Sequence, residues 1–219
     1  MPTVPTIGFL HTAAVHVATF DDLVREVDPL LRTAVTVRES VLSDAREFGP
    51  GDQRVRDGIE RALDELEADG ASVVVCTCST VGAVAEDLGR GRSISVTRVD
   101  RPMAAAAVRL GPRIVVVAAV DSTVAPTRQL IESIASECGA RVEITDVVCV
   151  GAWASFEAGD LDDYLDKVAA TCSDLAADCD VIVLAQASMA GAAGRANVDV
   201  PILSSPHLAI RAAVDHLRG

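Results

Sequence analysis

Residues 73–82 contain the feature that most constrains this chain. Three consecutive valines lead into a turn rich in thiol and hydroxyl groups, Cys-Thr-Cys-Ser-Thr. A short run of β-branched residues is typical of a buried strand in a parallel sheet. The segment 81–88 that follows is predicted to be helical. We therefore expect Cys78 where the carboxyl end of a strand meets a helix N-terminus, which is where open α/β sheets bind ligands.

Strand and helix patterns alternate along the rest of the chain. Strands are expected over residues 6–10, 33–37, 94–99, 113–120, 141–150, 180–185 and 200–203, and helices over 20–31, 54–68, 126–137, 159–177 and 206–217. A further helix is expected to have Pro102 in its first turn. This alternation predicts an α/β fold with mainly parallel sheets flanked by helices. The loops 13–19, 49–53 and 151–159 are expected to carry substrate selectivity.

The order of elements repeats halfway along the chain. Residues 73–80 match residues 181–189, an offset of 181 − 73 = 108 positions that is close to one domain length. We expect two pseudo-symmetric lobes, the first formed by residues 1–100 with 205–219 and the second by residues 101–204. The active site is expected in the cleft between them.

Composition excludes several classes of protein. Half of the residues are hydrophobic and 3% aromatic, which suits a Val, Ala, Leu and Ile core, and the net charge of −13 argues against a nucleic-acid partner. The N-terminal residues lack a basic signal-peptide region, and no apolar run reaches the roughly 18 residues of a membrane span. A cytoplasmic protein with no membrane partner is expected.

Motifs for metals and nucleotide cofactors are missing from the sequence. The six cysteines do not follow zinc-ligand spacing, and there is no G-x-G-x-x-G or Walker lysine motif. We expect no metal and no cofactor. The four cysteines outside the valine segment are predicted to be plain core residues, namely Cys138, Cys149, Cys172 and Cys179.

Cys78 is the leading candidate for catalysis. The positive end of a helix dipole favours a thiolate, which can act as a base or a nucleophile. Ser79 and Thr80, with the free backbone amides of the same turn, could bind a carboxylate. The alternative interpretation is a small residue that caps a helix, with a thiol that is merely buried.

Histidines and hydroxyl residues follow other predicted strands. His11 and Thr12 end the first strand, at the same sheet edge as Cys78, where His11 could tune the thiolate or act as an acid or base. His207 opens the last helix and is expected at that edge too. In the second lobe, Thr123 and Ser188 match the hydroxyl donors of the first, and Ser188 is expected to face Cys78. His11 and His207 could equally be structural.

Four segments resemble the aspartate/glutamate/hydantoin racemase superfamily, which also includes maleate isomerase and arylmalonate decarboxylase. They are Ile-Gly-Phe-Leu-His-Thr ending at Thr12, the Cys78-Ser79-Thr80 turn, Asp-Arg-Pro-Met at residues 100–103, and Leu-Ala-Gln-Ala-Ser-Met-Ala at residues 184–190. The Cys78 turn is similar to the Cys-Asn-Thr motif of that superfamily. The resemblance implies two α/β lobes, chemistry without PLP or metal, and a homodimer.

The resemblance also implies where this chain departs from its relatives. Two-base racemases of the superfamily place a second cysteine after the equivalent strand of the second lobe, where this chain has Gln186, Ala187 and Ser188. These three residues resemble a turn that binds substrate through an oxyanion pocket. Neither glutamine nor serine removes a proton from carbon near neutral pH, so His11 or His207 is expected to replace the missing thiol as an acid.

Several functions stay open on this basis. The first is a racemase or isomerase acting on a small amino acid or related carboxylate through the Cys78 thiolate, including a covalent step like that of maleate isomerase. The second is a decarboxylase or lyase acting on a malonate-like acid. The third is a non-catalytic protein that binds a carboxylate and has lost turnover together with the second cysteine.

Overall fold

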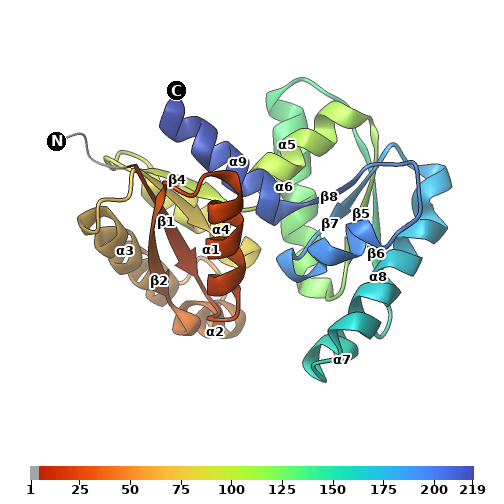
Figure 1. The fold of residues 1–219 in the computed structure, drawn as a ribbon, viewed down its shortest axis with the longest axis horizontal. Helices are drawn as coiled ribbons and strands as arrows, with labels where there is room; N and C mark the ends of the chain where they lie inside the picture. Colours follow the sequence, from red (N-terminus) through yellow and green to blue (C-terminus); the bar gives the residue numbers. More distant parts are fainter. Residues whose placement is uncertain (1–4) are drawn as a thin grey trace. The chain divides into compact units, whose positions relative to one another are not determined.

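The computed structural model describes residues 5–219, which form two compact units. Unit 1 comprises the chain up to Val99 together with Pro206–Gly219, and unit 2 comprises Asp100–Ser205. Each unit contains a four-stranded parallel sheet with helices beside it (Figure 1). The prediction of an α/β fold with two parallel-sheet lobes is confirmed. The expectation about residues 1–4, that they contain no signal peptide, lies outside the described residues.

Unit 1 has the strand order β2-β1-β3-β4. Its strands are β1 (Thr6–His11), β2 (Arg32–Val37), β3 (Val73–Cys76) and β4 (Ser95–Arg98). Its helices are α1 (His16–Val27), α2 (Glu39–Phe48), α3 (Gln53–Ala68), α4 (Ser79–Gly89) and α9 (Ser205–Arg218). The valine run forms β3, which is buried along its whole length beside β1. The central position of β3 explains its continuous apolar sequence.

Unit 2 repeats this order as β6-β5-β7-β8. Its strands are β5 (Arg113–Ala118), β6 (Glu143–Val148), β7 (Val181–Leu184) and β8 (Ile202–Ser204). Its α-helices are α5 (Arg101–Leu110), α6 (Val124–Glu137), α7 (Ala152–Glu157) and α8 (Leu161–Leu175), and the 3-10 segments are η1 (Asp121–Thr123), η2 (Ala176–Asp178) and η3 (Ala187–Gly194). The two central strands of unit 2 therefore correspond to those of unit 1, with β5 in the place of β1 and β7 in the place of β3.

The hydrogen bonds at the carboxyl edge of each sheet fix this correspondence residue by residue. In unit 1 the Thr77 amide donates to the Leu10 carbonyl at 3.0 Å, and in unit 2 the Ala185 amide donates to the Val117 carbonyl at 2.9 Å. The same bond thus recurs 185 − 77 = 108 residues later, the offset expected from the sequence. One position further along, Cys78 is equivalent to Gln186.

The sheet of unit 1 has two different apolar faces. Leu10 and Cys76 pack with residues of α2, α3 and α4, whereas Phe9 and Val75 pack with residues of α1 and α9. Successive side chains of a strand point to opposite faces. Residues that follow these strands therefore belong to one face or the other, which decides how the candidate site residues are grouped.

The helices of the structure differ from the sequence prediction at three places. Helix α1 begins at His16 rather than at residue 20, and its N-cap is Val15. Helix α2 was not expected from the sequence, and α7 occupies a segment that was expected to be a loop. Both missed helices lack a side-chain hydrogen bond at the N-cap, so the usual Ser, Thr or Asp start signal is missing.

Two smaller expectations concern cysteines and membranes. Cys149, Cys172 and Cys179 are buried core residues as expected, but Cys138 is exposed at the end of α6, so the core prediction is wrong for that residue. Across residues 5–219, none of the helices combines the length and the apolar character that crossing a membrane requires.

Candidate functional site

Cys78 lies at the N-terminus of an eleven-residue helix. It is the N-cap of α4, with extended backbone angles of φ −114° and ψ 111°, and its thiol makes no capping hydrogen bond. The thiol is half-buried, as are the Ser79 and Thr80 side chains of the first helical turn. The first amides of a helix have no partner within it, so this turn presents N–H donors beside an accessible sulfur. Such a turn favours a bound anion or a thiolate.

Cys76 has a structural position two residues earlier. It is fully buried, and its thiol points toward the Cys78 carbonyl oxygen at a sulfur–oxygen distance of 3.8 Å. Cys78 packs at the margin of the same apolar cluster. Cys76 therefore supports the backbone of the turn, and Cys78 is the sulfur that reaches solvent.

Thr12 lies on the same face of the sheet as Cys78. It comes two residues after Leu10, as Cys78 comes two residues after Cys76, and Leu10 pairs directly with Cys76. Thr12 and Cys78 therefore both follow the ends of paired parallel strands, at the carboxyl edge of the sheet. Thr12 is 6% exposed.

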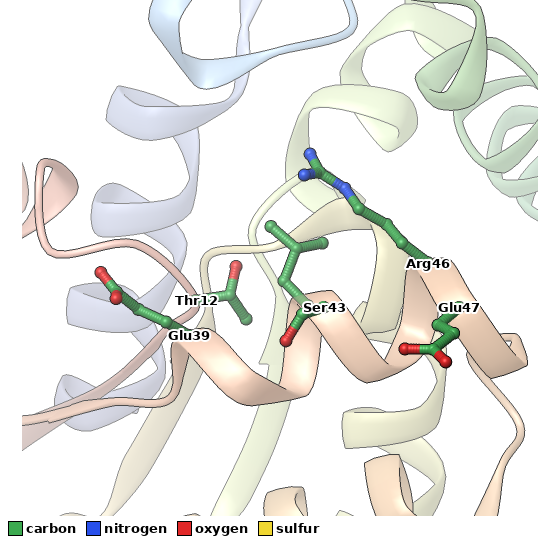
Figure 2. A pocket seen from close by; sticks show the side chains of 6 residues that line it. Thr12, Glu39, Ser43, Arg46 and Glu47 are labelled. Carbon is green, nitrogen blue, oxygen red and sulfur yellow. The ribbon is translucent and has the colours of Figure 1, made fainter.

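A pocket of about 450 Å³ opens beside Thr12 against helix α2 (Figure 2). It is lined by Thr12 and by five residues of α2: Glu39, Leu42, Ser43, Arg46 and Glu47. Cys78 does not line this pocket itself. Arg46 and Glu39 extend from α2 on the side of Thr12, while the Glu47 carboxylate points away from it.

Arg46 is the one basic residue of this lining. Its side chain is exposed, and among the described residues it makes no ion pair. A pocket lined by an unpaired guanidinium and a threonine hydroxyl is a suitable site for a carboxylate, because arginine binds carboxylates through two parallel hydrogen bonds. Sequence analysis missed Arg46 because it missed α2.

His11 lies at the same sheet edge as Cys78 but on the opposite face. Its ring contacts Phe9 and Phe20, with centroid distances of 5.6 Å and 5.5 Å, and its Nδ1 lies 2.8 Å from the Thr77 hydroxyl. The imidazole is fully buried, and Nε2 has no hydrogen-bond partner among the described residues. Burial lowers the pKa of His11 to about 4, and the nearby His16 adds a smaller lowering.

This environment makes His11 a neutral imidazole near pH 7. The Thr77 hydroxyl also lies 3.3 Å from the Leu10 carbonyl, to which it can donate. In that arrangement Nδ1 donates to Thr77 and Nε2 is the bare acceptor. The expectation that His11 shares the sheet edge of Cys78 is met, but it contacts the residues of α1 rather than those of α4.

His207 is placed at the other end of unit 1, which corrects the expectation that it lies at the ligand edge. Its Nε2 is 4.0 Å from the Glu26 carboxylate, in the last turn of α1. Helix α1 starts near the carboxyl end of β1 at His16, and ten residues at about 1.5 Å each separate Glu26 from that end by about 15 Å. Figure 1 shows α9 beside the far end of α1. His207 is half exposed.

The candidates of unit 2 follow β5 and β7. Thr123 ends η1 and its hydroxyl donates to the Val120 carbonyl at 2.9 Å. Ser188 lies 2.9 Å from the Tyr164 hydroxyl, and burial raises the pKa of Tyr164. Both hydroxyls are thus engaged within unit 2. The register makes Ser188 the equivalent of Thr80, and Gln186 rather than Ser188 the equivalent of Cys78.

Gln186 and Ala187 begin η3, and both are half-buried. The Gln186 side-chain oxygen accepts a hydrogen bond from the Ala119 amide at 2.7 Å, and its Nε2 is buried without a partner among the described residues. The segment after Gln186 is a 3-10 helix rather than an α-helix, which distinguishes it from the segment after Cys78.

The aromatic residues of α7 belong to the core of unit 2. Trp153 and Phe156 stack with a centroid distance of 5.0 Å, and Phe156 also contacts Tyr164 of α8. Both pack against the main cluster of unit 2. Of the two possibilities for this segment, a lid or packing, the contacts support packing.

Metal ligands do not gather at any of these positions. Over the part of the chain that the structure describes, no group of three His, Cys, Asp or Glu side chains could hold a metal ion.

Comparison with known proteins decides the family. The family model for Asp/Glu/hydantoin racemases matches residues 11–213. The chain belongs to the Asp/Glu/hydantoin racemase family. A search of curated proteins found no match for it. The family resemblance expected from the four sequence segments is thereby confirmed.

Solved structures of racemases and of a decarboxylase share the fold of this family member. The aspartate racemase of Picrophilus torridus superposes with a TM-score of 0.75 at 13% identity, covering 98% of this chain and 94% of that one. The allantoin racemase of Pseudomonas fluorescens superposes with a TM-score of 0.68 at 19% identity, covering 97% of this chain and 91% of that one. An arylmalonate decarboxylase superposes with a TM-score of 0.61 at 16% identity, covering 98% of this chain and 93% of that one. At these identities the likeness establishes the fold alone.

Proposed function

We propose that this family member is a cofactor-independent enzyme that acts on a small carboxylate, with the Cys78 thiolate as its base. One observation carries the proposal: the half-buried Cys78 thiol, without a capping bond, at the N-terminus of α4. A thiolate there could remove a proton from the carbon next to the carboxylate. The first amides of α4, with Ser79 and Thr80, would stabilise the negative charge that develops on oxygen.

Substrate binding is assigned to the pocket between Thr12 and α2. Arg46 would pair with a carboxylate of the substrate, and the Thr12 hydroxyl would donate a further hydrogen bond. Glu39 lies on the same side of α2 and could pair with an ammonium group. This combination favours an amino acid or a dicarboxylate over an uncharged ligand.

Racemisation or isomerisation is our first choice of reaction, on the strength of the family. Decarboxylation or lyase chemistry is the second, and one observation favours it: the position equivalent to Cys78 holds Gln186, which cannot act as a second base. His11 is neutral and on the other face of its sheet, and His207 lies toward the far end of α1. In our proposal Cys78 is therefore the base that removes the proton.

Deuterium exchange tests the role of Cys78. Amino acids and 2-substituted dicarboxylates are incubated in D₂O, and loss of the α-proton signal is followed by NMR. General base catalysis contributes roughly 10²–10⁴-fold, so Cys78→Ser should slow exchange by at least about 100-fold. Cys138→Ser, which changes an exposed thiol far along the chain, is the matched control and should exchange like the wild type.

Two results would contradict this proposal in different ways. Equal exchange by the wild type and Cys78→Ser would remove Cys78 from the reaction. Binding of carboxylates by a wild-type protein that exchanges none of them would instead support a non-catalytic binding protein, and ligand-induced thermal stabilisation detects such binding.

The pocket is tested through Arg46. Arg46→Gln should raise KM for a dicarboxylate about tenfold or more with a smaller change in kcat, because a charged hydrogen bond to the substrate is lost. Arg90→Gln is the control, since Arg90 is a highly exposed arginine beyond the end of α4. An unchanged KM in Arg46→Gln would place the carboxylate elsewhere.

A further inference from the structure

A buried hydrogen bond joins His11 to the residue that immediately precedes Cys78. Strands β1 and β3 pair in register up to Leu10 and Cys76. The residues that come next are His11 and Thr77, and because side chains alternate along a strand, these two point to the same face of the sheet. His11 Nδ1 lies 2.8 Å from the Thr77 hydroxyl, and both side chains are buried. The imidazole therefore contacts the turn that presents the thiol, although it contacts it from the other face.

Thr77 is attached to β1 through two hydrogen bonds to one carbonyl oxygen. Its amide donates to the Leu10 carbonyl at 3.0 Å, and its hydroxyl donates to the same oxygen at 3.3 Å. Because the hydroxyl proton is directed at Leu10, the hydroxyl oxygen is left to accept the proton of His11 Nδ1. His11 thereby orients the hydroxyl, and the hydroxyl fixes the last backbone position before Cys78.

The fold does not require this pair of side chains, because unit 2 forms the equivalent turn with two alanines. His11 is the last residue of β1 and Ala118 is the last residue of β5. Ala185 takes the place of Thr77 and makes the same backbone bond, without a hydroxyl to add a second one. The hydrogen-bonded pair thus accompanies the turn that carries a thiol, and the other turn forms without it.

The pair also lowers the stability of the core that surrounds it. His11 Nε2 is buried, and none of the described residues offers it a hydrogen bond. An unsatisfied buried nitrogen costs stability, and an apolar side chain against Phe9 and Phe20 would avoid that cost. Groups that are unfavourable for packing are expected where they serve a functional site.

We propose that His11 is a positioning residue for Cys78, which it holds in place through Thr77. This inference rests on the function proposed above. The imidazole is on the opposite face of the sheet from Cys78 and does not line the pocket beside Thr12, so its effect passes through the Thr77 hydroxyl. A misplacement of reacting groups by about 1 Å can slow a reaction about 100-fold. Loss of the pair should therefore lower kcat, while KM stays nearly unchanged.

Exchange of the α-proton of L-aspartate in D₂O, followed by NMR at several concentrations, measures both constants. Thr77→Val keeps the shape of the side chain without its hydroxyl and should lower kcat about tenfold to a hundredfold, with KM within about threefold. Thr77→Ser restores the hydroxyl and should recover kcat to within about threefold of the wild type. Thr36→Val is the matched control, because it removes an equally buried hydroxyl that bonds to Glu65 instead, and it should exchange like the wild type.

A double-mutant cycle tests whether His11 acts through Thr77. His11→Leu should lower kcat about as much as Thr77→Val, and the variant with both changes should lower it no further, since each change breaks the same link. His11→Asn should recover much of the loss, because its amide nitrogen can donate from near the position of Nδ1. Additive losses in the double variant, or a wild-type kcat in Thr77→Val, would overturn the positioning role.

Alkylation of Cys78 separates a failure of this inference from a failure of the proposed function. Iodoacetamide labelling at pH 7, followed by mass spectrometry, compares Cys78 with the exposed Cys138 of the same molecules. In Thr77→Val, Cys78 should react about threefold or more slowly relative to Cys138, because a displaced thiolate loses the first amides of α4. Thr77→Ser and Thr36→Val should keep the wild-type ratio.

The labelling result does not depend on turnover. Slower labelling of Cys78 in Thr77→Val, in a protein that exchanges no α-proton, would uphold the positioning role while the proposed reaction fails. Unchanged or faster labelling of Cys78 in Thr77→Val would overturn the positioning role and leave the proposed reaction standing wherever Cys78→Ser abolishes exchange.

Discussion

Protonation of His11 should make the stability of unit 1 depend on pH. The imidazole is fully buried against Phe9 and Phe20, and burial lowers its pKa to about 4 from the ordinary value of 6.5. Between pH 6.5 and about pH 4, His11 is protonated in the unfolded chain but stays neutral in the folded chain. Stability is therefore fully present above pH 6.5 and is lost as the pH falls toward 4.

The size of the loss follows from these two pKa values. At pH 5 the unfolded His11 is almost fully protonated and the folded one about a tenth protonated, which corresponds to a loss of about 2 kcal/mol relative to pH 7. The pKa of His16 is lowered by burial as well, so its contribution has the same sign. Most carboxylates titrate below pH 5, which makes the interval between pH 7 and pH 5 selective for histidine.

Urea denaturation at pH 7 and pH 5 measures this loss. The wild type should lose at least about 2 kcal/mol of unfolding free energy, and His11→Asn should lose about 2 kcal/mol less across the same interval. His216→Asn, at an exposed site near the end of α9, should behave like the wild type. The same loss in the wild type and His11→Asn would refute the reasoning, as would a folded His11 that titrates near 6.5 by NMR.

Two further substitutions test local packing. Gly82→Ala would place a Cβ 2.7 Å from Cβ of Arg98 and should lower the unfolding free energy, measured by chemical denaturation, by about 1–3 kcal/mol. Gly51→Ala is the control: its Cβ would meet nothing within 4 Å, so the unfolding free energy should change by less than about 0.5 kcal/mol. Tyr164→Phe removes the 2.9 Å hydrogen bond to Ser188 and should lower the unfolding free energy by about 1 kcal/mol; an unchanged midpoint would mean that this bond contributes nothing.

Local sequence patterns were sufficient for the strands and for the position of Cys78. The valine run, the offset of 108 positions and the small residues after each strand predict two parallel sheets of the same topology. The reason is that a buried parallel strand must be continuously apolar, and that pattern is visible without knowledge of its neighbours. Helix α2 was not predicted because it is only ten residues long and has no capping side chain. Its two buried residues, Val41 and Ala45, do have the four-residue spacing of a helix.

The grouping of the site residues could not be predicted in this way. His11, Thr12 and Cys78 all end strands at one edge, but only the pairing of Leu10 with Cys76 shows that Thr12 shares the face of Cys78 and that His11 does not. His207 follows a strand in the sequence, yet the packing of α9 on α1 places it beside Glu26.

The sequence by itself determined the fold class, the repeat and the thiol at a helix N-terminus, because each depends on residues close together in the chain. Tertiary structure alone decided that His11 is a neutral, buried imidazole, that Arg46 stands unpaired beside Thr12, and that Gln186 directs its amide nitrogen away from Ala119. These properties arise from contacts between segments that are distant in sequence. Strand register and helix packing bring those segments together, and neither is encoded in a local pattern.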